Sequence, residues 1–177
     1  MYYKAFRYSW HEIQRMYQHI VDTPIGWFRI VGNDAHIVNS GWINEEDAIV
    51  GGPGAHVEWK RRAEVQLNEY FFGDKRTFNL PLFMEGSDFQ SNVWACIREI
   101  PFGSTRTYSE IAQELGDKNK ARAIGTAAGE NPFLLFIPCH RIVGSDKSLT
   151  GYAGGLDRKE WLLKHEGAFE SEQLALF

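Results

Sequence analysis

The 177-residue chain is poor in cysteine and has no long apolar run. Its two cysteines, Cys96 and Cys139, are too few for a disulfide framework or a cysteine-rich zinc site, so we expect reduced thiols. The longest apolar stretch, residues 133–139, is far too short to cross a bilayer. The first residues carry charges and a histidine where a signal peptide needs an apolar segment. We therefore expect a cytoplasmic protein with no membrane partner.

The chain also lacks an excess of positive charge. Its formal net charge of −4 argues against a general affinity for nucleic acid. Residues 118–147 are nevertheless locally basic, with five Lys or Arg side chains against one Glu and one Asp. Such a patch on an acidic protein can contact phosphates, and a solvated face is the alternative.

The first half of the chain has the pattern of a small α+β domain. Residues 24–31 and 35–43 are rich in β-branched and aromatic side chains, and Gly32–Asp34 between them predicts a hairpin turn. The pattern then predicts a helix over about 56–72 and an extended segment over 77–83. We expect this domain to comprise residues 1–85.

The second half, residues 86–177, is mostly helical in pattern. A capping box at Ser87 opens one helix, and Pro101–Gly103 ends it. A second capping box at Thr107 opens a short helix, and a third helix follows over about 119–128. Two short helices joined by a tight turn that contains glycine form a helix-turn-helix, a motif that also occurs as an ordinary packing unit.

The third helix consists almost entirely of small residues. Ala121, Gly125 and Ala128 share one face, and within the stretch "ARAIGTAAG" Arg122 is the only long polar side chain. This composition favours close packing against another helix. It equally suits a helix that enters a nucleic-acid groove with Arg122 projecting beyond it.

The sequence "IPCHRIV" places Cys139 beside His140 at the end of an apolar run. Cys139 is therefore either a packed thiol or a nucleophile presented at the end of a buried strand. Successive side chains of a strand point to opposite faces, so cooperation of the pair requires a turn or a bridging water. The imidazole would also need a carboxylate on its other nitrogen, and Asp146 and Glu166 are the candidates.

Two other site types could use a Cys-His pair. A cysteine hydrolase would need an orienting residue, for which Asn131 is available, but the papain-type sequence around the cysteine is absent. A zinc site needs three or four ligands, and adjacent Cys and His rarely reach one metal. Neither type fits the sequence well.

Taken in order, these motifs closely resemble the methylated-DNA–protein-cysteine methyltransferases. The resemblance covers about 86–167 and rests on three stretches: "DFQSNVWACIREIPFGSTRTYSEIA", "ARAIGTAAGENP" and "IPCHRIVGSDKSLTGYAGGLDRKEWLLKHEG". It implies an α+β fold in which an RNase H-like domain precedes a winged-helix-like domain with the helix-turn-helix. Segment 1–16 has no counterpart in the family.

The resemblance implies DNA repair by direct reversal of damage. An alkyl group on the 6-oxygen of guanine, or on the 4-oxygen of thymine, would move irreversibly to one cysteine in a single turnover. The partner would be double-stranded DNA with an alkylated base, bound through its minor groove by a monomer. The base would be flipped out of the duplex, because a stacked base cannot reach a buried cysteine. The resemblance implies no cofactor and no zinc, since the extra cysteines of zinc-binding relatives are absent.

The motif positions assign the catalytic roles. Cys139 would accept the alkyl group, His140 would activate it through a water, and Glu166 would hold the far imidazole nitrogen. Tyr108 would lie at the base and assist its departure, and Arg122 would fill the space of the flipped nucleotide. DNA contacts are implied for Thr107, Tyr108, Ala121, Arg122, Ala123 and Gly125. The base pocket would comprise Asn131, which also serves as a hinge, with Ile142, Tyr152 and Ala153.

Three rival interpretations stay open. A non-catalytic relative that flags alkylated DNA would lack the active cysteine, whereas this chain has Cys139. A helix-turn-helix regulator would need an effector or dimerisation domain. A cysteine hydrolase would act on esters or peptides.

Cys96, flanked by Trp94, Ala95 and Ile97, is expected to be a packed and inert thiol, because apolar burial raises the pKa of a cysteine.

Overall fold

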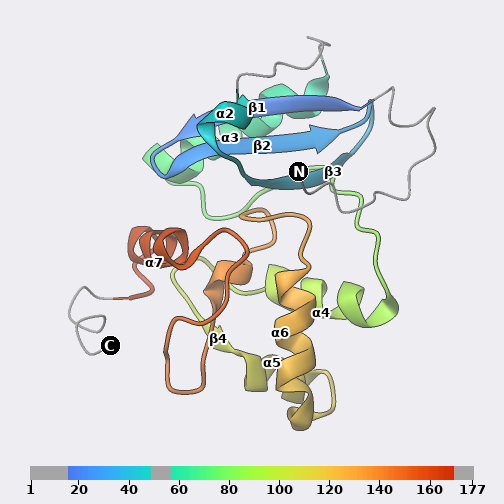
Figure 1. The fold of residues 1–177 in the computed structure, drawn as a ribbon, viewed down its shortest axis with the longest axis vertical. Coiled ribbons are helices and arrows are strands. Elements are labelled where there is room, and N and C mark those ends of the chain that lie inside the picture. Colours follow the sequence, from blue (N-terminus) through green and yellow to red (C-terminus); the bar gives the residue numbers. More distant parts are fainter. Residues whose placement is uncertain (1–15, 49–56, 170–177) are drawn as a thin grey trace.

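A computed structural model describes residues 16–48 and 57–169 of the chain. A three-stranded sheet with a long helix forms the upper layer in Figure 1, and a group of shorter helices lies below it. The predicted α+β class is confirmed.

The upper layer contains an antiparallel sheet in the order β1 (Tyr17–Thr23), β2 (Gly26–Gly32) and β3 (Ile37–Trp42). The predicted hairpin between β2 and β3 is confirmed, whereas β1 and the single helical turn α2 (Glu45–Ala48) were not predicted. Buried residues alternate with partly exposed ones along β2, as a strand with one covered face requires.

Helix α3 (Glu58–Phe72) confirms the helix predicted over 56–72 and packs into the core of the sheet. Trp59 on α3 is buried, and its indole nitrogen donates to the Asn33 carbonyl at 2.7 Å. Gly32 permits this approach, since a Cβ there would lie 2.9 Å from the Trp59 ring and 2.4 Å from the His36 carbonyl oxygen.

The predicted helices of the second half are also present. Helix α4 (Asp88–Arg98) and helix α5 (Tyr108–Glu114) both begin with complete capping boxes. A 3₁₀ turn, η1 (Lys118–Lys120), then leads into α6 (Ala121–Gly129), which packs against α4 and α5. This is the helix-turn-helix that the glycine and capping pattern indicated.

The apolar run before the cysteine is not a strand. Phe133 forms an isolated bridge with Ser40, residues 134–136 form a turn with Leu135 at a φ of 70°, and a 3₁₀ turn, η2 (Cys139–Arg141), follows. The short β5 (Ile142–Val143) pairs in parallel with β4 (Arg106–Thr107). The last described helix, α7 (Leu156–His165), was not predicted.

One hydrophobic core runs through both layers. The Ser40 amide donates to the Pro132 carbonyl at 2.8 Å, and the Ser40 hydroxyl donates to the Leu134 carbonyl at 3.1 Å. Strand β3 therefore binds the turns that precede the cysteine.

The domain boundary at residue 85 stays a prediction. Within 16–48 and 57–169, no helix is both long and apolar enough to cross a membrane.

Candidate active site

Cys139 opens the η2 turn and lies inside the protein, with 5% of its surface exposed. Its amide donates to the Ile137 carbonyl at 2.8 Å, and this bond completes the tight turn around Pro138. Burial raises the pKa of the Cys139 thiol to about 11, although a hydrogen bond from Asn131 and the charge of Lys159 act in the opposite direction. The resting group is therefore a thiol that needs help to ionise.

Asn131 fixes the sulfur from the end of α6. Its side-chain nitrogen donates to Cys139 Sγ at 3.2 Å and to the Ile137 carbonyl at 2.9 Å. Its side-chain oxygen accepts from the Phe133 amide at 2.9 Å. The amide thus joins the helix end to the cysteine turn and donates directly to the sulfur. Neither the hinge role nor the base contact predicted for Asn131 is tested by these bonds.

His140 is fully buried, and its Nε2 lies 2.8 Å from Glu166 Oε1. An ionised Glu166 accepts from a protonated Nε2, which leaves Nδ1 as an acceptor. This Nδ1 is buried and has no hydrogen-bond partner among the described residues. Burial lowers the pKa of His140 despite the carboxylate, so the ring is held neutral. The structure thus brings Glu166 to the imidazole, whereas Asp146 is exposed and binds Ser148.

Glu166 is the centre of a buried network. Its Oε1 accepts from Tyr70 at 2.6 Å and from Arg141 Nη2 at 2.9 Å, besides His140. Its Oε2 accepts from Arg141 Nε at 2.8 Å, and the Gly103 amide lies 3.4 Å away. Burial alone would raise the pKa of Glu166, but the hydrogen bonds and charges of His140 and Arg141 hold it well below its usual range.

Lys159 places a buried cation near the cysteine. Its Nζ donates to three carbonyl oxygens: those of Ile142 at 2.6 Å, Thr150 at 2.5 Å and Gly151 at 3.3 Å. Burial lowers the pKa of Lys159 to about 8, against a small opposing effect of Cys139. No carboxylate of the described residues pairs with this ammonium group, so a thiolate at Cys139 is its natural counter-charge.

The predicted base-contacting tyrosines, Tyr108 and Tyr152, both contact members of this group or the carbonyls around it. The Tyr108 hydroxyl, at the start of α5, donates to the Thr150 carbonyl at 3.2 Å, and burial raises the pKa of Tyr108. The Tyr152 ring lies 6.1 Å from the His140 ring, and the Trp42 indole approaches the Tyr152 hydroxyl at 3.5 Å. Burial, followed by the Cys139 charge, raises the pKa of Tyr152, so both phenols stay protonated near neutral pH.

The other predicted residues divide into buried and exposed groups. Ile142 is fully buried, and Ala153 is exposed. The Thr107 hydroxyl is buried in its capping box, where it accepts from the Glu110 amide at 3.2 Å. Gly125 faces Tyr108, since a Cβ there would lie 3.7 Å from the Tyr108 ring.

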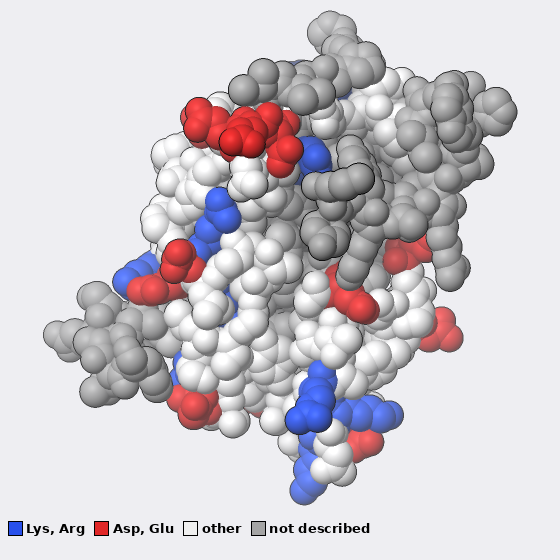
Figure 2. Space-filling model, in the orientation of Figure 1, with Lys and Arg blue, Asp and Glu red and all other residues white. Residues whose placement is uncertain are grey.

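A group of basic side chains lies on the surface at the N-terminal end of α6. Figure 2 shows Lys and Arg side chains gathered at the lower tip of the molecule, where α6 begins. The exposed members from this part of the chain are Lys118, Lys120 and Arg122. Arg122 makes no side-chain hydrogen bond or ion pair within the described ranges, and Ala123 beside it is also exposed. The arginine is therefore available to a ligand that approaches α6.

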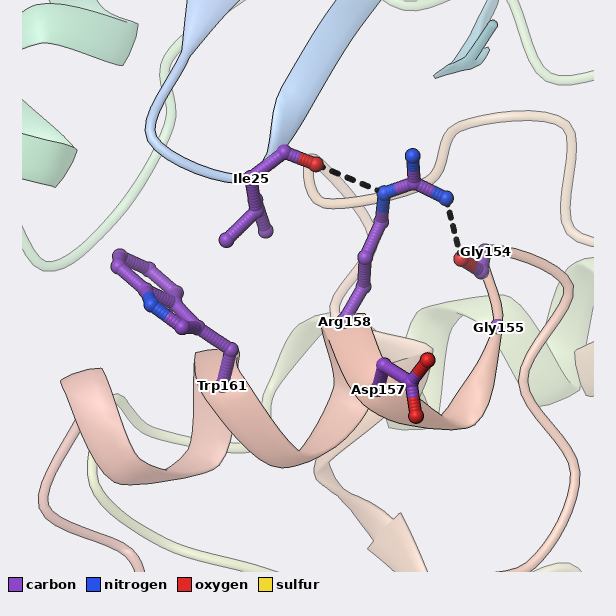
Figure 3. Close-up of a pocket in the computed structure, with 6 residues that line it drawn as sticks. All are labelled: Ile25, Gly154, Gly155, Asp157, Arg158 and Trp161. Atoms are coloured by element: carbon purple, nitrogen blue, oxygen red, sulfur yellow. Dashed lines mark hydrogen bonds between the residues drawn. The ribbon is translucent and has the colours of Figure 1, made fainter. Parts of the chain in front are cut away.

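A cavity of about 390 Å³ lies beside the Tyr152 loop, at the start of α7. Figure 3 shows Arg158 between the two layers, with its Nε donating to the Ile25 carbonyl at 2.9 Å and its Nη1 to the Gly154 carbonyl at 3.1 Å. None of the predicted site residues lines this cavity. At this cavity, Arg158 links the turn between β1 and β2, at Ile25, to the loop that precedes α7, at Gly154.

Sequence reasoning missed three members of the buried group: Tyr70, Arg141 and Lys159. Lys159 had a detectable pattern, because it shares the inward face of α7 with Leu162 and Leu163. A lysine in an apolar register indicates a buried cation. Tyr70 had none, since its contact with Glu166 spans 96 positions of the sequence. Within the described ranges, no cluster of three or more His, Cys, Asp or Glu could hold a metal ion, and the expected absence of zinc stays a prediction.

Comparisons with known proteins identify the family of this chain. The family described as "6-O-methylguanine DNA methyltransferase, DNA binding domain" matches residues 88–168. A methylated-DNA–protein-cysteine methyltransferase of Methanosarcina barkeri is 45% identical over 85% of this chain and 97% of its own length. One from Mycolicibacterium paratuberculosis is 38% identical over 89% of this chain and 96% of its own length.

Solved structures give the same result. The crystal structure of the Mycobacterium tuberculosis O6-methylguanine methyltransferase has a TM-score of 0.76 and 36% identity, covering 92% of this chain and 99% of that one. The structure of the M. tuberculosis protein in complex with DNA has a TM-score of 0.76 and 38% identity, covering 86% of this chain and 93% of that one. The family match and these relatives define the class of the protein as a DNA-repair enzyme that transfers alkyl groups. The chain belongs to the methylated-DNA–protein-cysteine methyltransferase family, as the sequence motifs predicted.

Proposed function

We propose that this protein removes the alkyl group from 6-O-alkylguanine, and from 4-O-alkylthymine, in double-stranded DNA by transferring it to Cys139. The observation that carries the proposal is the buried connection of His140 and Glu166 beside a thiol that Asn131 holds in place. A structural cysteine would need no such neighbours. The protein would act as a cytoplasmic monomer, with residues 86–177 forming the catalytic domain.

The transfer begins when the thiol loses its proton. The free Nδ1 of His140 takes the proton through a bridging water, while Glu166 stabilises the imidazolium that forms. Lys159 and the Asn131 amide stabilise the thiolate. The sulfur then attacks the alkyl carbon in line with its bond to the base oxygen. A carbon–sulfur bond forms, the carbon–oxygen bond breaks, and the Tyr108 hydroxyl donates a proton to the departing base. The proton that His140 took from the thiol then returns through water to the Tyr108 oxygen.

The reaction occurs once for each molecule, because a thioether has no mild path back to a thiol. The same cysteine that makes the protein reactive therefore ends its activity. This is the suicide stoichiometry that the sequence motifs implied.

The buried position of Cys139 requires the target nucleotide to leave the duplex. Unstacking costs a few kcal/mol, and a side chain that enters the vacated space offsets part of this cost. Arg122 projects from a helix of small residues and is free to take this position. The narrow profile of α6 fits the minor groove, and the basic side chains Lys118 and Lys120 lie where the phosphates would pass. Tyr152, Ala153 and Ile142 would enclose the flipped base.

A repair assay tests the proposal. The protein would be incubated with a duplex that contains one 6-O-methylguanine, and the loss of the methyl group from the DNA would be measured. We expect loss in proportion to the protein added, and no loss with Cys139→Ala, which should still bind the duplex. A protein that binds this duplex tightly but leaves the methyl group in place would be the non-catalytic relative instead.

A further inference from the structure

Tyr70 brings the first half of the chain into direct contact with the catalytic group. It lies on α3, is fully buried, and donates its hydroxyl to Glu166 Oε1 at 2.6 Å. His140 Nε2 approaches the same oxygen at 2.8 Å. The phenol and the imidazole therefore share one acceptor atom.

The position of this hydroxyl is fixed from several directions. The Tyr70 ring packs edge-on against Phe71 and Phe102 at 5.0 and 5.9 Å, and at a tilt against Phe78 at 5.3 Å. The Tyr70 carbonyl oxygen also lies 2.9 Å from His165 Nε2 on α7. These contacts to the ring and the backbone position the hydroxyl at the carboxylate.

Tyr70 acts as the hydrogen-bond donor in its contact with Glu166. Burial, followed by the charge of Glu166, raises the pKa of Tyr70, so the phenol keeps its proton. The other groups that face Glu166 and His140 are the Arg141 guanidinium, the Lys159 ammonium and the Tyr152 ring. His165 lies on the far side of the Tyr70 ring. No other phenol of the described residues donates to Glu166.

We propose that Tyr70 is a positioning residue that sets the basicity of His140 through Glu166, and this inference rests on the proposed function. A carboxylate oxygen has two lone pairs, and here Tyr70, Arg141 and His140 all donate to Oε1. The phenol stabilises the negative charge and so weakens its pull on the imidazole proton. The imidazole consequently stays neutral and able to accept the thiol proton. The first half of the chain thus controls the chemistry of the second.

Replacement of Tyr70 by Phe tests this role, because it removes only the hydroxyl. We expect the pKa of His140 to rise by roughly half a unit. Without the phenol, the negative charge of Glu166 is less stabilised and attracts the imidazole proton more strongly. The acid limb of the pH–rate profile for single-turnover methyl transfer should move to higher pH by the same amount. Histidine resonances in a nitrogen-15 NMR titration report the first quantity, and they do not depend on alkyl transfer.

Phe72→Leu is the matched control. Phe72 lies on the same helix with 75% of its surface exposed, and the substitution keeps the Tyr70 hydroxyl, so it should move neither the His140 titration nor the acid limb. In a Glu166→Gln background, Tyr70→Phe should change the rate no further.

The outcomes separate this inference from the proposed function. If Tyr70→Phe leaves His140 unshifted while the wild-type protein transfers methyl groups, the inference fails and the proposed function stands. If the His140 titration shifts in a protein that transfers no methyl group, the coupling of Tyr70 to His140 stands and the proposed function fails. A Tyr70→Phe protein that does not fold would also overturn the inference, because the hydroxyl would then serve the fold.

Discussion

The Asn131 amide donates to Cys139 Sγ at 3.2 Å while its oxygen accepts from the Phe133 amide at 2.9 Å. One side chain therefore joins the end of α6 to both ends of the turns that carry the cysteine. Because α6 is the helix proposed to contact DNA, the same residue connects binding with chemistry.

Replacement of Asn131 by Ala should slow methyl transfer on the order of tenfold or more, because the sulfur loses a donor that favours its thiolate. The free energy of unfolding should fall by about 1–3 kcal/mol, since buried backbone groups lose their partners. Asn39→Ala is the control, because Asn39 donates to the Pro132 carbonyl at 3.0 Å and does not reach the cysteine. Single-turnover kinetics and urea denaturation measure both effects. Equal slowing by the two variants would contradict a specific role for Asn131.

Lys159 should matter only while it is charged. Replacement of Lys159 by Met removes the buried cation and should reduce the transfer rate on the order of tenfold near neutral pH. The pKa of Lys159 is lowered to about 8, so its charge is present below that pH and is lost above it. The ratio of wild-type to variant rates should therefore shrink as the pH rises through about 8. Lys164→Met, on the exposed side of α7, should leave the rate unchanged. A ratio that stays constant with pH would rule out the charge effect.

Arg122 should be needed only when a base leaves a stack. We expect Arg122→Ala to slow repair of duplex DNA on the order of tenfold or more, because base flipping costs a few kcal/mol. Reaction with the free alkylated base should be almost unaffected. Thr126→Ala, at another exposed position of α6, serves as the control. The comparison uses the two substrates side by side, and equal losses on both would remove Arg122 from the flipping step.

Glu166 should stabilise the fold in a pH-dependent way. Its pKa in the folded protein lies below the ordinary value of 4.5, so its stabilising effect is complete above that pH and disappears as the pH falls further. Glu166→Gln should cost about 3 kcal/mol at pH 7, because Arg141 is left buried without its partner. The difference from the wild type should shrink in acid. Urea denaturation at pH 7 and pH 3.5 measures it, with the exposed Glu160→Gln as a control that changes little. A difference that does not depend on pH would show that Glu166 contributes by packing alone.

Local sequence patterns predicted α4, α5 and α6 of the second half, but not α7. The capping boxes at Ser87 and Thr107 specify where α4 and α5 begin, because both bonds of each box lie within four residues. The sequence required a turn or a bridging water for Cys139 and His140 to cooperate, and the η2 turn is present, whereas the apolar run before it gave no indication of a turn. Its backbone is bonded by Ser40, almost a hundred positions away, and periodicity does not record such contacts.

Only the part of the candidate site that lies within the family motifs was named from the sequence. Cys139, His140 and Glu166 were named from those motifs, and the structure places the last two in contact. The carboxylate network was not predictable. Tyr70 lies on α3, far from Glu166 in the sequence, and it occupies a buried position in the same apolar pattern as its neighbours on that helix. Long-range polar contacts of this kind leave no local pattern.

The two cysteines have different environments, and this difference permits a decisive measurement. Burial raises the pKa of Cys96, whose Sγ donates to Glu114 at 3.4 Å and which has no histidine bonded to it among the described residues. Cys139 has Asn131 and Lys159 to stabilise its thiolate and lies beside His140 in the η2 turn.

The protein should be incubated with an excess of methylated duplex, digested, and mapped by mass spectrometry. We expect one methyl group for each chain, attached to the sulfur of Cys139, with no modification of Cys96 and no further repair after the first turnover. Cys139→Ala should bind the duplex and acquire no label. More than one repaired base for each protein molecule, or a methyl group on Cys96, would contradict this expectation.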